Sequence, residues 1–183
     1  MFRKIKVLIL FSFSLLALVM QGCLHFNTAS YKINLNGQDS GSVEVVVKDI
    51  KSDAINSKEL AEDKKNLFDY ALKGEDFIER MESEGKFITD RKLQIQNDKL
   101  FAVINYDFKN INDVEGIVYE DPFYYLTLEP GDSVVSTNGK IIESKDYKRI
   151  IWDNSIDTLE FEMFSDDTDA GNLTSMAAYF NKE

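Results

Sequence analysis

Cys23 and His25 are the only cysteine and the only histidine in the chain, so they are the first residues to consider for chemistry. A cysteine thiolate is a nucleophile and a metal ligand, and histidine is a frequent general base and metal ligand. No other residue of either type is present to complete a Cys-His, Ser-His or zinc arrangement elsewhere in the chain. The role of Cys23 therefore depends on the residues that precede it.

Those residues have the pattern of a secretory signal peptide. Arg3, Lys4 and Lys6 form a basic flank, and residues 7–20 form an apolar run directly after it. The run is shorter than the about 20 apolar residues that a transmembrane helix needs. We therefore expect residues 1–22 to be a signal peptide that is absent from the mature protein.

Gly22 and Cys23 resemble the cleavage junction, or lipobox, of bacterial lipoproteins, although Met20 and Gln21 stand where leucine and a small residue are commoner. In that family the cysteine sulfur is diacylated, the signal peptide is cut just before it, and the new amino group usually receives a third acyl chain. The resemblance implies that Cys23 is lipidated, and two or three acyl chains anchor a protein stably. The alternative is an ordinary signal peptide that leaves a free thiol in an oxidising compartment. With Cys23 lipidated, His25 belongs to a tether.

The mature chain is strongly acidic. Removing residues 1–22 leaves 161 of the 183 residues, and this leader holds three of the 21 basic residues and none of the 32 acidic ones, so the formal net charge becomes −14. A chain of this length forms one domain with a substantial core. Its charge is unfavourable for nucleic acid and for anionic lipid headgroups. A cationic partner or a bound divalent cation is compatible with this charge. The simpler alternative is a solvated acidic surface.

The first half of the mature chain predicts a β-hairpin followed by helices. Residues 31–36 and 42–48 alternate apolar and polar types, and residues 37–41 supply a five-residue turn. Asn56 is a helix cap, and Glu59 completes a capping-box pattern. Apolar residues then recur at helical spacing as far as residue 81, with Gly74 dividing the region into two helices and Gly85 ending it.

Strand patterns dominate after Gly85. Residues 110–116 predict a single helical turn, and the expected strands are residues 87–96, 99–108, 123–128, 133–136, 140–143, 149–153 and 158–164. Strands, then a helical segment, then more strands indicate an α+β domain with a mostly antiparallel sheet. The expected organisation is a signal peptide (1–22), a lipidated tether (23–30) and a single α+β domain (31–183).

Aromatic residues are the best candidates for a ligand site. Consecutive aromatics at 123–125 place rings on both faces of a strand, and together with three further residues they would line an apolar pocket with a few hydroxyl groups. The expected ligand-binding residues are Tyr106, Phe108, Phe123, Tyr125 and Trp152. Ordinary core packing is the alternative, since strands favour these residue types.

Carboxylates offer two further possibilities. Residues 166–172 (Asp-Asp-Thr-Asp-Ala-Gly-Asn) invite comparison with a calcium loop, but Ala170 and Ala177 occupy positions where an EF-hand needs oxygen ligands. An acidic surface loop is the simpler interpretation, and we expect no metal and no cofactor. A glycosidase-type pair would need two carboxylates with separated pKa values across a cleft, and no local motif selects such a pair.

Several segments together resemble bacterial lipoproteins of the LppM type and related uncharacterised lipoproteins. They are residues 23–26 with 31–45, residues 106–114, and residues 136–139 (Ser-Thr-Asn-Gly) with 150–152 (Ile-Ile-Trp). The resemblance spans most of the mature chain and implies a curved antiparallel sheet that packs around a helix and can enclose an apolar cavity. Many members carry a C-terminal membrane helix, whereas residues 176–183 have no such pattern, so we expect the lipid to be the sole anchor. No catalytic residue is carried over.

We therefore expect a non-catalytic lipoprotein of the bacterial cell envelope. Leu24, rather than aspartate, follows Cys23, which favours the outer membrane, facing the periplasm or the cell surface. The expected partners are the membrane, through the lipid anchor, and either a lipid or small apolar ligand or an envelope protein. The alternatives are a carboxylate-dependent envelope hydrolase and a surface-exposed structural or interaction module.

Overall fold

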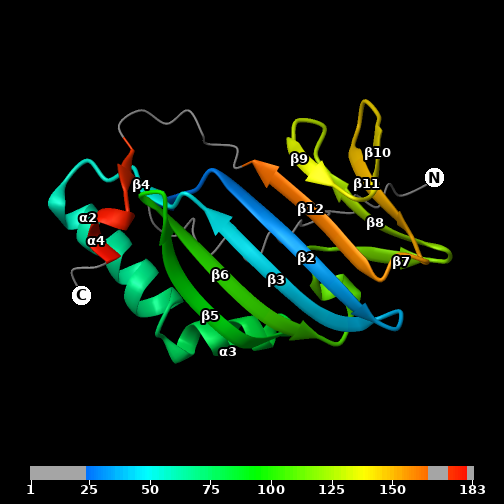
Figure 1. Cartoon of the computed structure of the whole chain (residues 1–183), viewed down its shortest axis with the longest axis horizontal. Coiled ribbons are helices and arrows are strands. Elements are labelled where there is room, and N and C mark those ends of the chain that lie inside the picture. Colours follow the sequence, from blue (N-terminus) through cyan, green and yellow to red (C-terminus); the bar gives the residue numbers. More distant parts are fainter. Residues whose placement is uncertain (1–23, 165–172, 181–183) are drawn as a thin grey trace, which may run out of the picture.

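A six-stranded antiparallel sheet is the largest part of the computed structural model, which describes residues 24–164 and 173–180 (Figure 1). The strand order is β5-β6-β3-β2-β12-β9. The strands are β2 (Thr28–Asn36), β3 (Ser40–Lys48), β5 (Lys86–Gln96), β6 (Lys99–Phe108), β9 (Val134–Thr137) and β12 (Thr158–Phe164). Cys23, the predicted signal peptide at 1–22 and the acidic segment at 166–172 lie outside the described residues.

Two smaller antiparallel sheets complete the β-structure. One has the order β10-β11-β8-β7 and consists of β7 (Val118–Glu120), β8 (Phe123–Leu128), β10 (Lys140–Glu143) and β11 (Lys148–Asp153). The other joins β1 (Leu24–His25) and β13 (Thr174–Ser175) to either side of β4 (Lys51–Ser52). Residues 24–30, assigned to a tether from the sequence, thus contain β1 and the start of β2, and the Leu24 and Phe26 side chains are buried.

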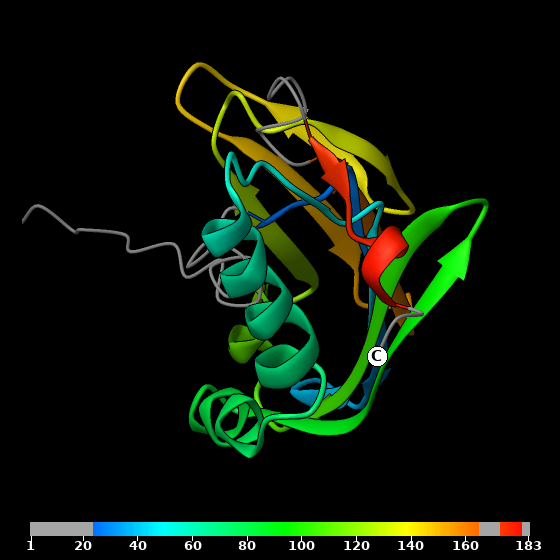
Figure 2. The ribbon, with the colours of Figure 1, turned by 90° about the vertical axis from the view of Figure 1, so that its left-hand side faces the viewer.

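The helices lie on the concave side of the large sheet, which curves around them (Figure 2). Helix α2 (Ser57–Lys64) continues directly into the π-helix η1 (Lys65–Ala71), and α3 (Glu75–Ser83) follows Gly74. The buried residues on these elements include Phe68, Phe77 and Met81. The short helices η2 (Ile111–Asp113) and α4 (Ala177–Phe180) complete the set. No helix in the described part of the chain is long and apolar enough to cross a membrane.

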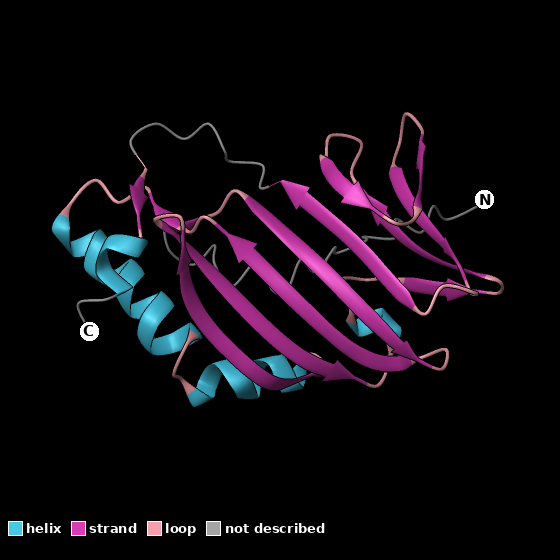
Figure 3. Cartoon of the chain, in the orientation of Figure 1, coloured by secondary structure: helices cyan, strands magenta, loops and turns pink. Residues whose placement is uncertain are grey.

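The fold is mainly β, so the predicted α+β class is wrong. Thirteen strands form three antiparallel sheets, and only 21% of the described residues are helical (Figure 3). The helical pattern at 56–84 does form helices, but these cover only part of one face of the large sheet. The described residues after Gly116 form β7 to β13 and add only the single turn of α4, so strands rather than further helices extend this part of the structure.

The local predictions are largely confirmed. Strands β2 and β3 form the predicted hairpin, but their ladder runs from the pair of residues 28 and 48 to that of 36 and 40, so the turn has three residues rather than five. Asn56 caps α2, because its Oδ1 accepts from the backbone N–H groups of Lys58 and Glu59. Gly74 separates η1 from α3 as predicted, and each of the seven strands expected after Gly85 agrees with the observed strand within one residue at either end.

The core lies between the concave face of the large sheet and the elements that cover it. Apolar side chains on this face are almost fully buried, and they include Ile33, Val43, Val45, Leu159 and Phe161. Burial of each such side chain contributes about 1.5–3 kcal/mol to folding. Within this apolar interior lies a small number of polar groups, which form the candidate site.

Candidate ligand-binding site

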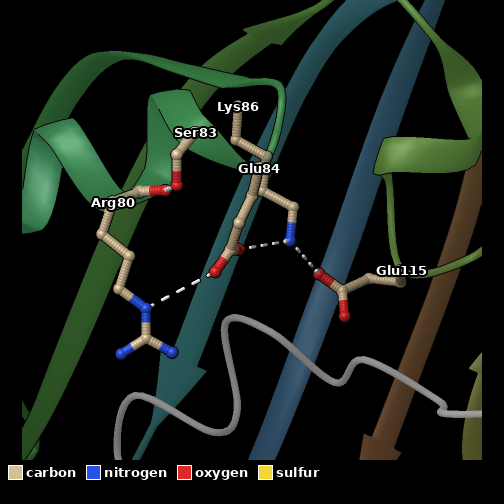
Figure 4. Close-up of polar contacts among 5 residues, drawn as sticks. All are labelled: Arg80, Ser83, Glu84, Lys86 and Glu115. Carbon is tan, nitrogen blue, oxygen red and sulfur yellow. Dashed lines mark hydrogen bonds and ion pairs between the residues drawn. The ribbon is translucent and has the colours of Figure 1, made fainter.

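A buried ion pair lies in the interior between the end of α3 and the loop after η2. The Nζ atom of Lys86 is 3.3 Å from the Oε1 atom of Glu115, and the two side chains are 2% and 3% exposed (Figure 4). Burying a charged group is unfavourable unless another charge and hydrogen bonds compensate for it. A pair of this kind inside an apolar core therefore calls for a specific explanation.

Unusual backbone positions bring the two side chains together. Gly85, just before Lys86, has φ +80°, and a Cβ atom there would overlap the carboxylate of Asp113. Glu115 and Gly116 are both left-handed, with φ values of +51° and +74°. A left-handed conformation costs a residue with a side chain about 1–2 kcal/mol, so the rest of the fold must stabilise Glu115 in this position.

The ion pair is the inner end of a line of charges that begins at the surface. Arg80 Nε lies 3.4 Å from Glu84 Oε1, and Glu84 Oε2 lies 3.9 Å from Lys86 Nζ (Figure 4). The exposed fractions of the four side chains fall from 34% at Arg80 and 25% at Glu84 to almost zero at Lys86 and Glu115. The signs alternate along the line, so the four formal charges sum to zero.

Two tyrosine hydroxyls belong to the same interior region. Tyr31 on β2 and Tyr106 on β6 both point to the covered face of the sheet, because their register partners, Val45 and Val43, lie on that face of β3 between them. Strands two positions apart are separated by about 10 Å, so two tyrosine side chains can converge across β3. Neither hydroxyl has a hydrogen-bond partner within the described part of the chain, and the same holds for Glu115 Oε2.

The buried charges and hydroxyls influence one another's pKa values. Burial raises the pKa of Glu115, the Lys86 ammonium opposes this change, and the charge of Glu84 adds to it. Burial raises the pKa of both Tyr31 and Tyr106 well above the ordinary value, and the Glu115 carboxylate raises each further. Both tyrosines are therefore neutral hydroxyl groups near Glu115 at physiological pH.

This arrangement is chemically suited to hold the polar end of a ligand. Buried polar atoms almost always have hydrogen-bond partners, but four in this region have none in the described chain: the Tyr31 and Tyr106 hydroxyls, Glu115 Oε2 and, at the outer side of Lys86, Glu84 Oε2. The surroundings are apolar, with the Tyr31 ring stacked on Phe161 at a centroid distance of 4.6 Å. Apolar surfaces with a few converging polar groups are typical of small-molecule sites.

The aromatic residues selected from the sequence do not form one site. Tyr106 belongs to the buried cluster, and Phe108 is buried two residues further along β6. Trp152 is fully buried in the second sheet, where its Nε1 donates to Asn138 Oδ1 at 2.7 Å. Phe123 is 43% exposed, and Tyr125 lies under the Arg149 guanidinium, 4.6 Å from its ring centroid.

Sequence reasoning missed three of the four cluster residues. Lys86 stands between the predicted helix end at Gly85 and the predicted strand at 87–96, and Tyr31 begins the predicted strand at 31–36. Glu115 had one local signal, since it stands among the apolar residues Val114 and Ile117, which are both fully buried. An acidic residue in such a setting indicates a buried charge, but the sequence does not indicate its partner.

The described surface also has open hollows. They lie on the outer face of the large sheet, and their linings include Lys32, Asn34, Ser42, Glu44 and Glu160. Lys32 and Glu160 form an exposed ion pair at 3.8 Å there. Within residues 24–164 and 173–180, no group of three or more histidine, cysteine or acidic side chains is arranged to hold a metal ion.

Comparison with known proteins gives no further guide to this site. The chain matches no protein-family model, no curated protein and no solved structure. The functional argument therefore depends on the geometry of the cluster and on the sequence.

Proposed function

We propose that this protein is a lipid-anchored envelope lipoprotein that binds a ligand with an apolar body and a polar end. The observation that supports binding is the interior cluster of Lys86, Glu115, Tyr31 and Tyr106, in which two hydroxyls and one carboxylate oxygen have no partner in the described chain. A polar group of a ligand would supply these missing hydrogen bonds. The ligand's apolar part would then contact the aliphatic and aromatic side chains of the concave face.

The anchor in this proposal is Cys23. The basic flank, the apolar run and the Gly22-Cys23 junction support lipidation, and the favoured location is the outer membrane, facing the periplasm or the cell surface. The bound ligand would then be a lipid or another small amphipathic molecule of the envelope. The proposed role is carriage or sensing of this ligand without catalysis.

The hydrolase alternative requires two carboxylates near one another, and the chain has such a pair. Glu84 and Glu115 approach the same Lys86 Nζ, and the pKa of Glu115 is raised, mainly by burial. However, Lys86 lies between them, and Glu115 is almost completely buried in an ion pair with it. Binding of a polar group requires less rearrangement of this pair than attack on an envelope polymer, so we favour binding.

A protein partner is the second candidate, and it has its own observation. Phe123, Ile141 and Ile142 in the second sheet are each at least 40% exposed. Phe123 lies on β8 and the two isoleucines lie on β10, with β11 between these strands, and exposed apolar side chains on one sheet are typical of interaction surfaces. A partner at this sheet is compatible with a ligand in the interior.

Co-purification tests the proposed function. The full chain would be extracted from the membranes of its native host in detergent, and native mass spectra would be recorded before and after gentle organic extraction. We expect a non-covalent mass that extraction removes and that Tyr106→Phe reduces, whereas the covalent acyl chains on Cys23 would remain. An identical mass before and after extraction, in both proteins, would direct the search to protein partners.

A further inference from the structure

Three polar atoms of the cluster have no hydrogen-bond partner in the described chain. Tyr31 and Tyr106 each have a hydroxyl hydrogen to donate, and Glu115 Oε2 can accept. An alcohol oxygen accepts two hydrogen bonds and donates one. One hydroxyl group can therefore accept from both tyrosines and donate to Glu115. An ether or ester oxygen lacks the donor and would leave Glu115 Oε2 without a partner.

The charges of the cluster restrict the ligand further. Arg80, Glu84, Lys86 and Glu115 alternate in sign and balance, so the site has no net formal charge to neutralise a ligand ion. A ligand anion beside the two tyrosines would face the Glu115 carboxylate, and a cation would add to the charge of Lys86. Burying an uncompensated charge is strongly unfavourable, so an uncharged ligand is favoured.

The apolar surroundings define the rest of the molecule. Val43 and Val45 lie on the face of β3 between the two tyrosines, and Phe161 stacks on Tyr31. These side chains offer contacts to hydrocarbon and no hydrogen bonds. From these observations we infer that the site recognises the hydroxyl group of an uncharged amphiphile, with Tyr31 and Tyr106 as donors and Glu115 as acceptor. This inference rests on the proposed ligand-binding function and specifies its ligand class.

A set of three matched probes tests the inference. Hexan-1-ol has the hydroxyl, 1-methoxypentane has similar size and an oxygen without a hydrogen, and hexanoate carries a charge. The full chain would be labelled with [¹³Cζ]tyrosine, reconstituted in nanodiscs of deuterated lipid and titrated with each probe. The ¹³Cζ resonance of a tyrosine responds to hydrogen bonding at its own hydroxyl, so partition of the probe into lipid does not mimic binding. Tyr31→Phe and Tyr106→Phe assign the two resonances.

Tyr124 provides the internal control, because its hydroxyl already donates to the backbone carbonyl of Gln38 at 3.1 Å. We expect hexan-1-ol to shift the Tyr31 and Tyr106 resonances saturably while that of Tyr124 stays unchanged. The ether should bind at least about tenfold more weakly, because it leaves a buried polar group without a partner. Hexanoate should have no saturable effect.

The remaining outcomes would overturn the inference in distinguishable ways. Equal binding of alcohol and ether would mean that Glu115 does not accept from the ligand. Preferential binding of hexanoate would identify an anion site, and the general proposal of ligand binding would survive. No saturable shift with any probe would overturn the hydroxyl inference, and if the co-purification experiment also gave no ligand, it would overturn the proposed function as well.

Discussion

The Nζ atom of Lys86 lies 3.3 Å from the Oε1 atom of Glu115, and neither side chain is more than 3% exposed. Removal of one member would leave the other as a buried charge. We expect Lys86→Met to lower the free energy of unfolding by about 3 kcal/mol, in the range known for broken buried pairs. The double variant Lys86→Met/Glu115→Gln should lose clearly less stability than the two single variants, Lys86→Met and Glu115→Gln, lose in sum. Chemical denaturation of the four proteins measures this coupling, and additive losses would show that the pair is not an energetic unit.

The raised pKa of Glu115 predicts a specific dependence of stability on pH. A carboxyl group with a higher pKa in the folded state binds protons more strongly when folded, so its favourable contribution is present below the unfolded value of 4.5 and is lost as the pH rises through the folded pKa. The stability of Glu115→Gln relative to the natural protein should therefore increase as the pH rises above about 4.5 and then become constant. Denaturant titrations across this range, made at constant ionic strength, measure the difference.

Glu162 is a matched control, because its pKa is shifted in the opposite direction to that of Glu115. Partial burial alone would raise its pKa, but hydrogen bonds from Lys48 Nζ and Thr28 Oγ1, at 2.7 and 2.6 Å, outweigh burial and lower the pKa. Its stabilising contribution is thus present above 4.5 and is lost as the pH falls. Glu162→Gln should lose stability at neutral pH and regain parity with the natural protein in acid. The same trend in both variants would contradict the assignment for Glu115.

The unpartnered hydroxyls of Tyr31 and Tyr106 predict an uncommon result for delipidated protein. Because each phenylalanine variant removes a buried polar group that has no partner in the described chain, Tyr31→Phe and Tyr106→Phe should be neutral or stabilising by up to about 1 kcal/mol. Tyr124→Phe removes a hydroxyl that donates to Gln38 O and should lose about 1 kcal/mol. Thermal or denaturant unfolding compares the three. A loss at Tyr31 and Tyr106 as large as that at Tyr124 would mean that their hydroxyls have partners in the ligand-free protein.

Asn138 connects the two larger sheets, and its loss should be measurable. Its Oδ1 accepts from Trp152 Nε1 on β11 and from the Glu160 backbone N–H on β12, and its Nδ2 donates to the Thr158 carbonyl. Asn138→Ala leaves the fully buried Trp152 without a hydrogen bond, so we expect a loss of about 2 kcal/mol. Unfolding followed by the fluorescence of this single tryptophan measures it.

Asn36→Ala, at an exposed strand end, serves as the control for Asn138 and should change stability by less than about 0.5 kcal/mol. Gly139→Ala offers an independent check of the same contact, because a Cβ at Gly139 would lie 2.7 Å from Trp152 Nε1 and 2.9 Å from the Ile151 carbonyl oxygen. Both Asn138→Ala and Gly139→Ala should be destabilised. If both variants were as stable as Asn36→Ala, the hydrogen bonds of Asn138 would contribute little to the stability of the fold.

The lipid anchor can be tested separately from the binding site. Cys23→Ala should release the protein from the membrane fraction and abolish labelling by an alkyne fatty-acid probe, because the proposed acylation site is lost. Tyr106→Phe is the control, since it should label and fractionate like the natural protein. Unchanged labelling of Cys23→Ala would refute the lipobox assignment.

The sequence predicted individual strands well because their signal is local. Alternation along residues 99–108 and the Asn97-Asp98 turn depend only on neighbouring residues, and β5 and β6 form as expected, with both turn residues left-handed. The fold class was wrong because it depends on which strands pair. The short β7 was not predicted, and the separation of β8 and β11 into a second sheet depends on contacts between distant segments.

The candidate site was even less accessible from the sequence. Lys86 and Glu115 are 29 residues apart, and Tyr31 and Tyr106 lie on one face of the sheet because β2 and β6 both pair with β3. No periodicity encodes that strand order. Tyr106 was selected for its aromatic ring, whereas the proposed site depends on its hydroxyl together with a buried charge pair.

The strand order of the large sheet also has a consequence for the order of folding. Strand β2 pairs with β3 directly along the chain, but its other neighbour, β12, lies far along the chain, with Thr158 opposite Asn34. During synthesis from the N-terminus, the β2–β3 hairpin therefore emerges with one hydrogen-bonding edge unsatisfied until nearly the whole domain has been made. Such an edge is a template for wrong pairing between chains. Closure of the sheet should accordingly be a late, slow step governed by contacts of long sequence separation, and nascent chains that stop before β12 should be the species most prone to aggregate.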